Sequence, residues 1–277
     1  MKILKPLGIL LSSILLLATS CKKTDATDNE AETSFALTAN GAITENFIED
    51  ASDVKDEALT ERDLVGNFGP AGPETILGCA VVTVTPQSGF PKTILIDFGT
   101  GCTGPNGVLR SGKIQVVISD SIRRPGSTAV MSFDNYFVNA HHIEGTITWT
   151  NTTTGIQRAW RRDVVNLKTT APGGRFWTYN SVRNITQTEG NGTPRNRLDD
   201  IFIISGNGSV TNASGVSRTN RILIELRKKV SCDNIDRGTI RFEGPSNYAL
   251  LDFGDGTCDN LATISINGGT PRTIILR

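Results

Sequence analysis

Short apolar runs separated by glycine, asparagine, proline and serine follow one another from Cys79 to the end of the chain. Apolar and polar residues alternate in several runs, so that Ile114, Val116 and Ile118 fall on one face of an extended strand. Strands this close together leave no room for crossover helices, so they should pair antiparallel. Roughly 13 strands exceed what a flat open sheet usually holds. The pattern predicts an all-β domain over 66–277, an antiparallel meander that forms a sandwich or a partly closed barrel.

The chain before this domain has a different pattern. Residues 21–43 are polar and contain few large apolar side chains, which predicts a flexible tether. Over 44–65 apolar residues recur at helical spacing with acids between them, and Thr44 can cap the first turn. This second segment predicts one short acidic amphipathic helix.

The balanced overall charge hides two parts of opposite sign. Residues 24–63 contain twelve acidic and two basic residues. Residues 64–277 contain sixteen acidic and twenty-two basic residues, a net charge of +6. The acidic helix could therefore lie against the basic domain, or its charges could simply keep the N-terminal segment extended. Of these two interpretations we favour the extended segment.

The first twenty residues have the pattern of a secretory signal. Lys2 and Lys5 precede an apolar run, and small residues lead to Cys21. The run is shorter than the roughly 20 residues that a membrane-spanning helix needs. The stretch "ATSC" ending at Cys21 resembles a lipobox, in which the cysteine receives diacylglycerol and becomes the new N-terminus. We therefore expect a signal peptide over 1–20 and a membrane anchor on Cys21.

The other four cysteines lie in two copies of one motif. "IDFGTGCTGP" begins at Ile96 and "LDFGDGTCDN" begins at Leu251. Each copy follows an apolar strand that is preceded by a further cysteine, and in an exported chain an even number of cysteines indicates disulfides. A hairpin whose far ends lie side by side would bring each local pair together. The predicted disulfides close hairpins over 79–102 and 232–258, through Cys79–Cys102 and Cys232–Cys258.

The repeated Asp-Phe-Gly motif is best explained as a turn. Its aspartates can accept hydrogen bonds from turn amides, its phenylalanines can enter the core, and its glycines allow positive φ. A calcium site from Asp252, Asp255 and Asp259 is chemically reasonable, since hard oxygen ligands gather on one loop. The first copy, however, has threonines in place of the last two acids. We therefore expect neither a metal nor a cofactor here.

Several of these motifs together resemble a known group of proteins. They are the lipobox, the acidic helix, "DFGTGCTGPNG" with the following "SGKI", "TEGNGTP", and "DFGDGTCDN" with the following "ATISING". The chain is similar over nearly its whole mature length to uncharacterised outer-envelope lipoproteins of Bacteroidota. The resemblance implies an outer-membrane location and an architecture. It implies no activity and does not decide between the periplasmic face and the cell surface.

The central strands carry the most distinctive candidate site. Aromatic and basic residues occur together there, and they could form a platform on which sugar rings stack while arginines donate hydrogen bonds. The platform residues are Trp149, Trp160, Trp177, Tyr179, Arg161 and Arg183. Alternation also allows an interpretation that we favour, in which the tryptophans are core residues and the arginines are solvated on the opposite face.

The functional prediction from sequence is a lipid-anchored lipoprotein of the outer membrane or cell surface with a non-catalytic binding or structural role. The alternative is a glycan-handling protein, either a carbohydrate-binding module or a glycoside hydrolase. No residue pattern identifies a catalytic group. The expected partners are the membrane, through the lipid on Cys21, and a glycan or another envelope protein. Nucleic acid is not expected for an exported, anchored chain.

Overall fold

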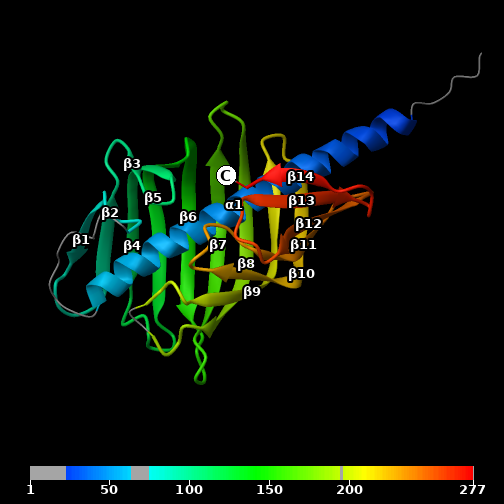
Figure 1. The fold of residues 1–277 in the computed structure, drawn as a ribbon. Coiled ribbons are helices and arrows are strands. Elements are labelled where there is room, and N and C mark those ends of the chain that lie inside the picture. The colour runs from blue at the N-terminus through cyan, green and yellow to red at the C-terminus, as the bar shows by residue number, and fades with distance from the viewer. Residues whose placement is uncertain (1–22, 64–74, 194–195, 277) are drawn as a thin grey trace, which may run out of the picture.

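The computed structural model describes residues 23–63, 75–193 and 196–276, and within the helix it describes the side chains of 29–59. The predicted signal peptide over 1–20 and Cys21 lie outside the described residues. One helix and fourteen strands make up the described chain (Figure 1). Their bounds are α1 Lys23–Asp63, β1 Val81–Thr85, β2 Lys92–Asp97, β3 Cys102–Thr103, β4 Leu109–Ile118, β5 Thr128–Val138, β6 His141–Asn151, β7 Ala159–Thr170, β8 Phe176–Glu189, β9 Ile201–Asn212, β10 Ser217–Lys229, β11 Arg237–Glu243, β12 Tyr248–Asp255, β13 Leu261–Ile266 and β14 Arg272–Ile275.

The strands form a single antiparallel sheet in chain order. The order is β1-β2-β4 and then each strand in turn to β14, while the two-residue β3 pairs with β4 beside this path. The sheet does not close, because β1 and β14 remain at its two ends. It bends around α1, so that β13 and β14 lie near the N-terminal half of the helix (Figure 1). The predicted all-β antiparallel meander is confirmed, as a curled open sheet that wraps one helix.

Bulges at glycines accompany this curl. Every pairing from β4–β5 to β11–β12 contains a register shift. Gly145 and Gly206, at two of these shifts, have φ of +124° and +130°. A Cβ on Gly206 would lie 2.2 Å from the carbonyl oxygen of Val182, so no other residue fits there without a shift. Bulges bend strands and increase their twist, which allows the long sheet to turn around the helix.

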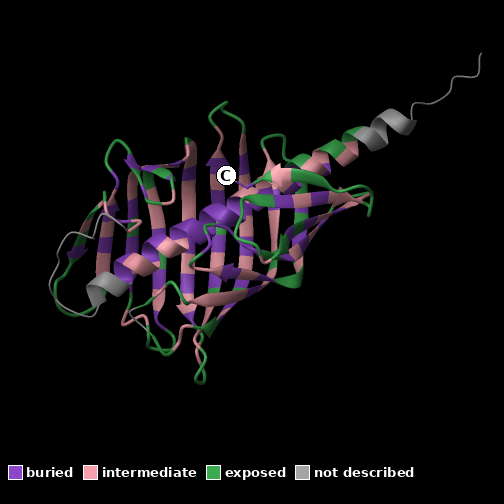
Figure 2. Ribbon diagram, in the orientation of Figure 1, coloured by how far each residue is buried: buried purple, intermediate pink, exposed green. Residues whose placement is uncertain are grey.

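The helix differs from the sequence-based prediction in length. It is continuous over 41 residues from Lys23, so the predicted flexible tether over 21–43 is helical in its described part. Leu37 and Ala42, in that segment, are 1% and 0% exposed. Packing against the sheet supplies the stabilisation that the local composition lacks, and tertiary contacts of this kind commonly stabilise helices. The buried residues lie on the helix and on the face of the sheet that it covers (Figure 2).

The two predicted disulfides are both present. Cys79 pairs with Cys102 and Cys232 pairs with Cys258, with Cα atoms 5.7 Å and 5.2 Å apart. They lie toward opposite ends of the strand order, beside the β1–β4 and β11–β13 hairpins. The repeated motif therefore places one disulfide near each end of one curled, open sheet.

The two Asp-Phe-Gly turns are built as predicted. The Asp97 and Asp252 carboxylates each accept a hydrogen bond of 2.8 Å from the amide of the glycine two residues later. The phenylalanine between them is 2% exposed in both copies. Both glycines have positive φ, +60° and +96°. The duplicated motif thus gives the same local hydrogen bond twice, just after β2 in the first copy and at the end of β12 in the second.

Gly206→Ala tests whether the bulges carry the curl. The substitution places a methyl group against Val182 in a backbone region that disfavours side chains, so we expect a loss of about 2–3 kcal/mol in the free energy of unfolding. Gly155→Ala is the control, because nothing lies within 4 Å of its added Cβ. Urea denaturation followed by circular dichroism measures both. Equal stability of the two variants would contradict the role assigned to Gly206.

Candidate functional site

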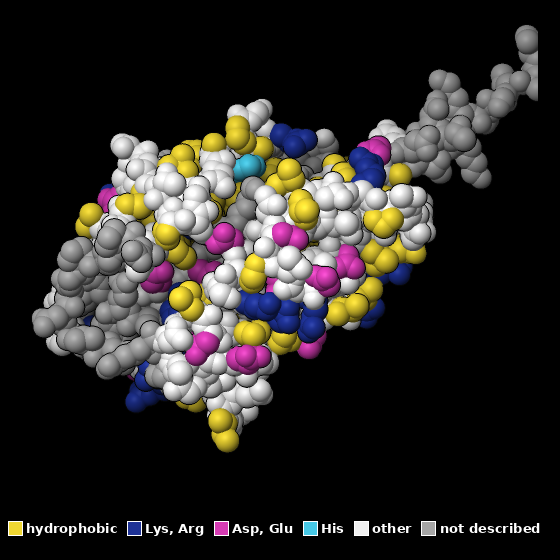
Figure 3. All heavy atoms as spheres, viewed as in Figure 1, with side chains coloured by type: hydrophobic (Ala, Val, Ile, Leu, Met, Phe, Trp, Pro, Cys, Tyr) yellow, Lys and Arg dark blue, Asp and Glu magenta, His cyan; other side chains and the backbone are white. Residues whose placement is uncertain are grey.

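The acidic helix lies on basic side chains of the sheet. Five ion pairs each join an acid of α1 to an arginine or lysine on the concave face of the sheet. The pairs are Glu30–Arg218, Glu45–Arg183, Glu49–Arg162, Asp50–Arg110 and Asp53–Lys228. The charge asymmetry of the sequence therefore corresponds to a packed interface, and the extended segment that we favoured from sequence is wrong. Outside this interface, Figure 3 shows basic and acidic side chains side by side over β8–β10.

Glu45 is the most deeply buried of these acids. Its side chain and those of Arg162 and Arg183 are all 0% exposed. Arg183 Nε donates to Glu45 Oε1 at 3.0 Å, and the Tyr179 hydroxyl donates to the same oxygen. Burial alone would raise the pKa of Glu45, but the charges of Arg183 and Arg162 outweigh burial and hold that pKa below its ordinary value. Glu45 is therefore an ionised anchor for the helix.

The predicted aromatic platform does not form an exposed row. Trp177 is 1% exposed and donates Nε1 to Thr44 Oγ1 at 2.7 Å. Tyr179 and Arg183 lie on the same buried face of β8, in contact with Glu45. These three side chains hold the helix and do not face solvent. The interpretation that the tryptophans are core residues holds for Trp177.

The arginines are divided between the two faces of the sheet. Arg161 is exposed on the outer face and its Nη2 lies 2.7 Å from Asp163 Oδ1. Its neighbour Arg162 points inward, as strand alternation requires. The prediction that the arginines would be solvated opposite the tryptophans is therefore wrong for Arg183, and Arg162 is buried on the same inner face. Acids on the helix make their burial possible, and periodicity within the sheet does not reveal those partners.

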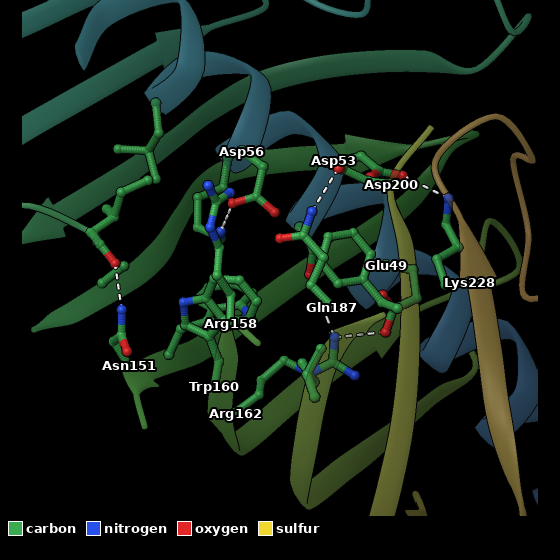
Figure 4. A pocket seen from close by; sticks show the side chains of 18 of the residues that line it. Glu49, Asp53, Asp56, Asn151, Arg158, Trp160, Arg162, Gln187, Asp200 and Lys228 are labelled. Carbon is green, nitrogen blue, oxygen red and sulfur yellow. Dashed lines mark hydrogen bonds and ion pairs between the residues drawn. The ribbon is translucent and has the colours of Figure 1, made fainter. Parts of the chain in front are cut away.

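A pocket of about 110 Å³ lies between the C-terminal half of α1 and strands β6–β9 (Figure 4). The other two predicted platform residues, Trp149 and Trp160, line it. Trp149 is 5% exposed and Trp160 is half-buried. Lys55 Nζ lies 4.8 Å from the Trp149 ring centroid, and Trp160 meets Phe202 edge to face at 6.2 Å. The structure thus gathers one part of the predicted platform in a concave site and buries the rest.

Charged groups surround these rings. Arg162 Nη1 lies 2.6 Å from Glu49 Oε1, and Lys228 Nζ lies 2.9 Å from Asp53 Oδ2. A second set of pairs joins Lys55 to Asp56 and Arg197 to Asp53. On the sheet side of the pocket, Gln187 Nε2 donates to Asp200 Oδ1 at 2.6 Å. Figure 4 shows Glu49 and Asp53 of the helix with Arg162, Gln187 and Lys228 of the sheet around the pocket.

Two pocket acids have raised pKa values. Burial raises the pKa of Glu49 despite the charge of Arg162 beside it. Burial likewise raises the pKa of Asp200 to about 6, against the opposing charge of Arg197. Asp200 therefore changes charge near neutral pH, unlike an ordinary surface carboxylate.

The candidate calcium ligands do not converge. Asp252 accepts a hydrogen bond from Gly254, Asp255 from Thr257, and Asp259 from Leu261. Each carboxylate thus caps its own turn. Within the described ranges, no three histidine, cysteine, aspartate or glutamate side chains are placed to hold a metal ion.

Most of the pocket residues have no signature in the sequence. Arg158, Arg197 and Asp200 lie in or near loops, and no motif joins them to the helix acids. The one available signal is the opposite charge of the helix and the domain, which predicts contact but not which pairs form.

Comparison with protein-family models, with curated proteins and with solved structures finds no match for this chain. In the part of the chain that the structure describes, no helix has both the length and the apolar character needed to cross a membrane.

Glu45→Ala tests the buried ion cluster. The substitution leaves Arg183 buried without its carboxylate, so we expect the free energy of unfolding to fall by about 3–5 kcal/mol. Glu32→Ala is the matched control. Glu32 lies on the same helix as Glu45 and pairs with Arg272 of β14, but its side chain is 66% exposed. Exposed pairs of this kind contribute about 1 kcal/mol or less. Urea denaturation should separate the two variants, and similar losses would contradict the central role of Glu45.

Asp200→Asn tests the raised carboxyl pKa. The folded pKa of about 6 exceeds the ordinary value of 3.8, so the folded state binds the proton more tightly than the unfolded state. The contribution of Asp200 to stability is therefore greatest when it is protonated and falls as pH rises through this interval. Urea denaturation at several pH values should show that Asp200→Asn lacks this fall. Asp199→Asn should retain a smaller fall, because burial is the largest cause of the raised pKa and the charge of Asp199 adds to it. The same profile in wild type and Asp200→Asn would refute the assignment.

Proposed function

We propose that this protein is a lipid-anchored lipoprotein of the bacterial outer envelope with a non-catalytic binding or structural role. The signal pattern of the first twenty residues and the lipobox-like "ATSC" support the anchor on Cys21. The two disulfides are consistent with export, because disulfides persist in oxidising compartments.

The observation that carries this proposal is the continuous helix. It begins at Lys23, two residues after the proposed lipid site, and runs to Asp63. At about 1.5 Å per residue it is roughly 60 Å long. Its buried ion pairs clamp it into the sheet. A lipid on Cys21 would therefore be joined to the domain through a helix packed into its core.

The pocket chemistry fits binding better than catalysis. Glu49, Asp53 and Asp56 each face a basic side chain in an ion pair, and Asp200 accepts a hydrogen bond from Gln187. Acids engaged in this way orient and neutralise neighbouring charges. General acid–base catalysis instead needs a carboxyl group within reach of a substrate proton.

Glycan handling is the second candidate function. One observation favours it, namely that Trp149 and Trp160 line the same pocket. Aromatic rings beside charged donors are suited to holding a ring-shaped ligand. The burial of Trp177 and Tyr179 removes the extended platform that a long polysaccharide would need.

Cys21→Ser tests the anchor. We expect the wild-type chain, expressed in a bacterium with lipoprotein processing, to incorporate an alkyne-tagged palmitate and to fractionate with membranes. Cys21→Ser should lose the label because no thiol remains to be acylated, while the double variant C79S/C102S should keep it. Mass spectrometry should place the mature N-terminus at the acylated cysteine. A labelled Cys21→Ser protein, or a mature N-terminus elsewhere, would refute the anchor.

A further inference from the structure

One cation in the pocket differs from the others in its pairing. Lys55, Arg162, Arg197 and Lys228 each form an ion pair with an acid of α1. The half-buried Arg158 forms no ion pair with any residue in the described ranges. An arginine placed at a pocket without a carboxylate partner can accept an anion from outside.

The buried Arg162 leaves a second unmet demand at the same pocket. Its Nη1 donates to Glu49 and its Nη2 lies 3.6 Å from Glu45 Oε2 in an ion pair. Its Nε has no hydrogen-bond acceptor among the described residues. Arg162 is 0% exposed. Buried donors normally find a partner in the protein or in a bound molecule. Glu45 and Glu49 thus compensate the charge of Arg162, and its Nε is left as one unsatisfied donor beside the pocket.

The indoles give the pocket a flat apolar wall. Trp160 is held by Phe202 on one side, and Trp149 is covered by Lys55. Because Trp160 is half-buried and Trp149 is 5% exposed, the accessible ring surface belongs mainly to Trp160. A planar or sugar ring stacks well on such a face.

The volume limits the size of the ligand. The pocket measures about 110 Å³. Water occupies about 30 Å³ in the liquid, and an engineered cavity of about 150 Å³ binds benzene. The pocket is smaller than the cavity that binds benzene, so a single ring would be enclosed only in part and its substituent would extend toward solvent. A chain of several sugars would lie mostly outside the pocket.

We propose that this pocket binds a small monocyclic carboxylic acid, whose carboxylate pairs with Arg158 and whose ring packs on Trp160. The bidentate geometry of a guanidinium suits a carboxylate. The charge of Arg158 acts to lower the pKa of Asp200, but the two side chains form no ion pair, and Asp200 Oδ1 accepts a hydrogen bond from Gln187. The inference rests on the binding role proposed above and is independent of the membrane anchor.

Isothermal titration calorimetry on the full chain in detergent tests this inference. The probes are benzoate and glucuronate, each compared with a neutral analogue, benzyl alcohol and glucose. We expect at least one acid to bind with a Kd below about 1 mM and at least about tenfold more tightly than its analogue. Binding of benzoate would assign an aromatic ring, and binding of glucuronate would assign a sugar ring.

Arginine variants locate the site. Arg158→Met should weaken acid binding at least about tenfold, since it removes the charge that pairs with the carboxylate. Arg158→Lys should keep the preference for the acid over its neutral analogue. Arg161→Met is the matched control, three residues away on the outer face and paired with Asp163. Urea denaturation of each variant checks that it is folded.

Three results would overturn the proposal. They are failure of both acids to bind at millimolar concentration, equal binding of acid and neutral analogue, and equal loss in Arg158→Met and Arg161→Met. The acylation of Cys21 is measured by mass spectrometry on the same preparation. Loss of acid binding in an acylated protein would therefore reject the ligand while leaving the anchor intact, and the reverse result would reject the anchor alone.

Discussion

The burial of Glu45 between Arg183 and Arg162 is the interaction on which the rest of the structure depends. Removing three charged side chains from water is costly. Their mutual pairing, the Tyr179 hydrogen bond to Glu45, the Glu49 ion pair with Arg162 and the Arg183 hydrogen bond to Asn220 offset that cost. The geometry is satisfied only when the helix lies in one position along the sheet. The cluster therefore sets the position of the helix as well as its attachment, and that position decides what surrounds the pocket.

The curl of the sheet and the placement of the helix support each other. Bulges at glycines such as Gly206 let the meander bend, and the bent sheet encloses the helix on its concave face. The helix fills space on the concave face that the curled open sheet would otherwise leave empty. The pocket lies where the C-terminal half of the helix passes over β6–β9, so it combines acids from one element with arginines and indoles from another.

Local features of the chain were predictable and distant ones were not. Strand alternation, the duplicated Asp-Phe-Gly turn and the two disulfides follow from residues close together in the chain, and the structure contains all three. The length of the helix and the burial of Arg183 depend on partners more than a hundred residues away. Residues 21–43 lack an apolar stripe strong enough to indicate a helix. The described part of that segment is held against the sheet by ionic as well as apolar contacts, and an apolar pattern does not reveal the ionic ones.

The sequence by itself determined the all-β class, the antiparallel order, the pairing of the cysteines and the construction of the repeated turns. Each of these depends on the spacing of residues along the chain, because local backbone geometry strongly constrains how residues close in sequence can be arranged. Only the tertiary structure decided that the acidic helix extends back to Lys23 and lies inside the curled sheet. It also decided that Trp177 and Tyr179 are buried beneath the helix, and that Trp149 and Trp160 share a pocket with Arg158. Opposite charges predict attraction, but they do not specify which of many acids meets which arginine until the sheet has curled.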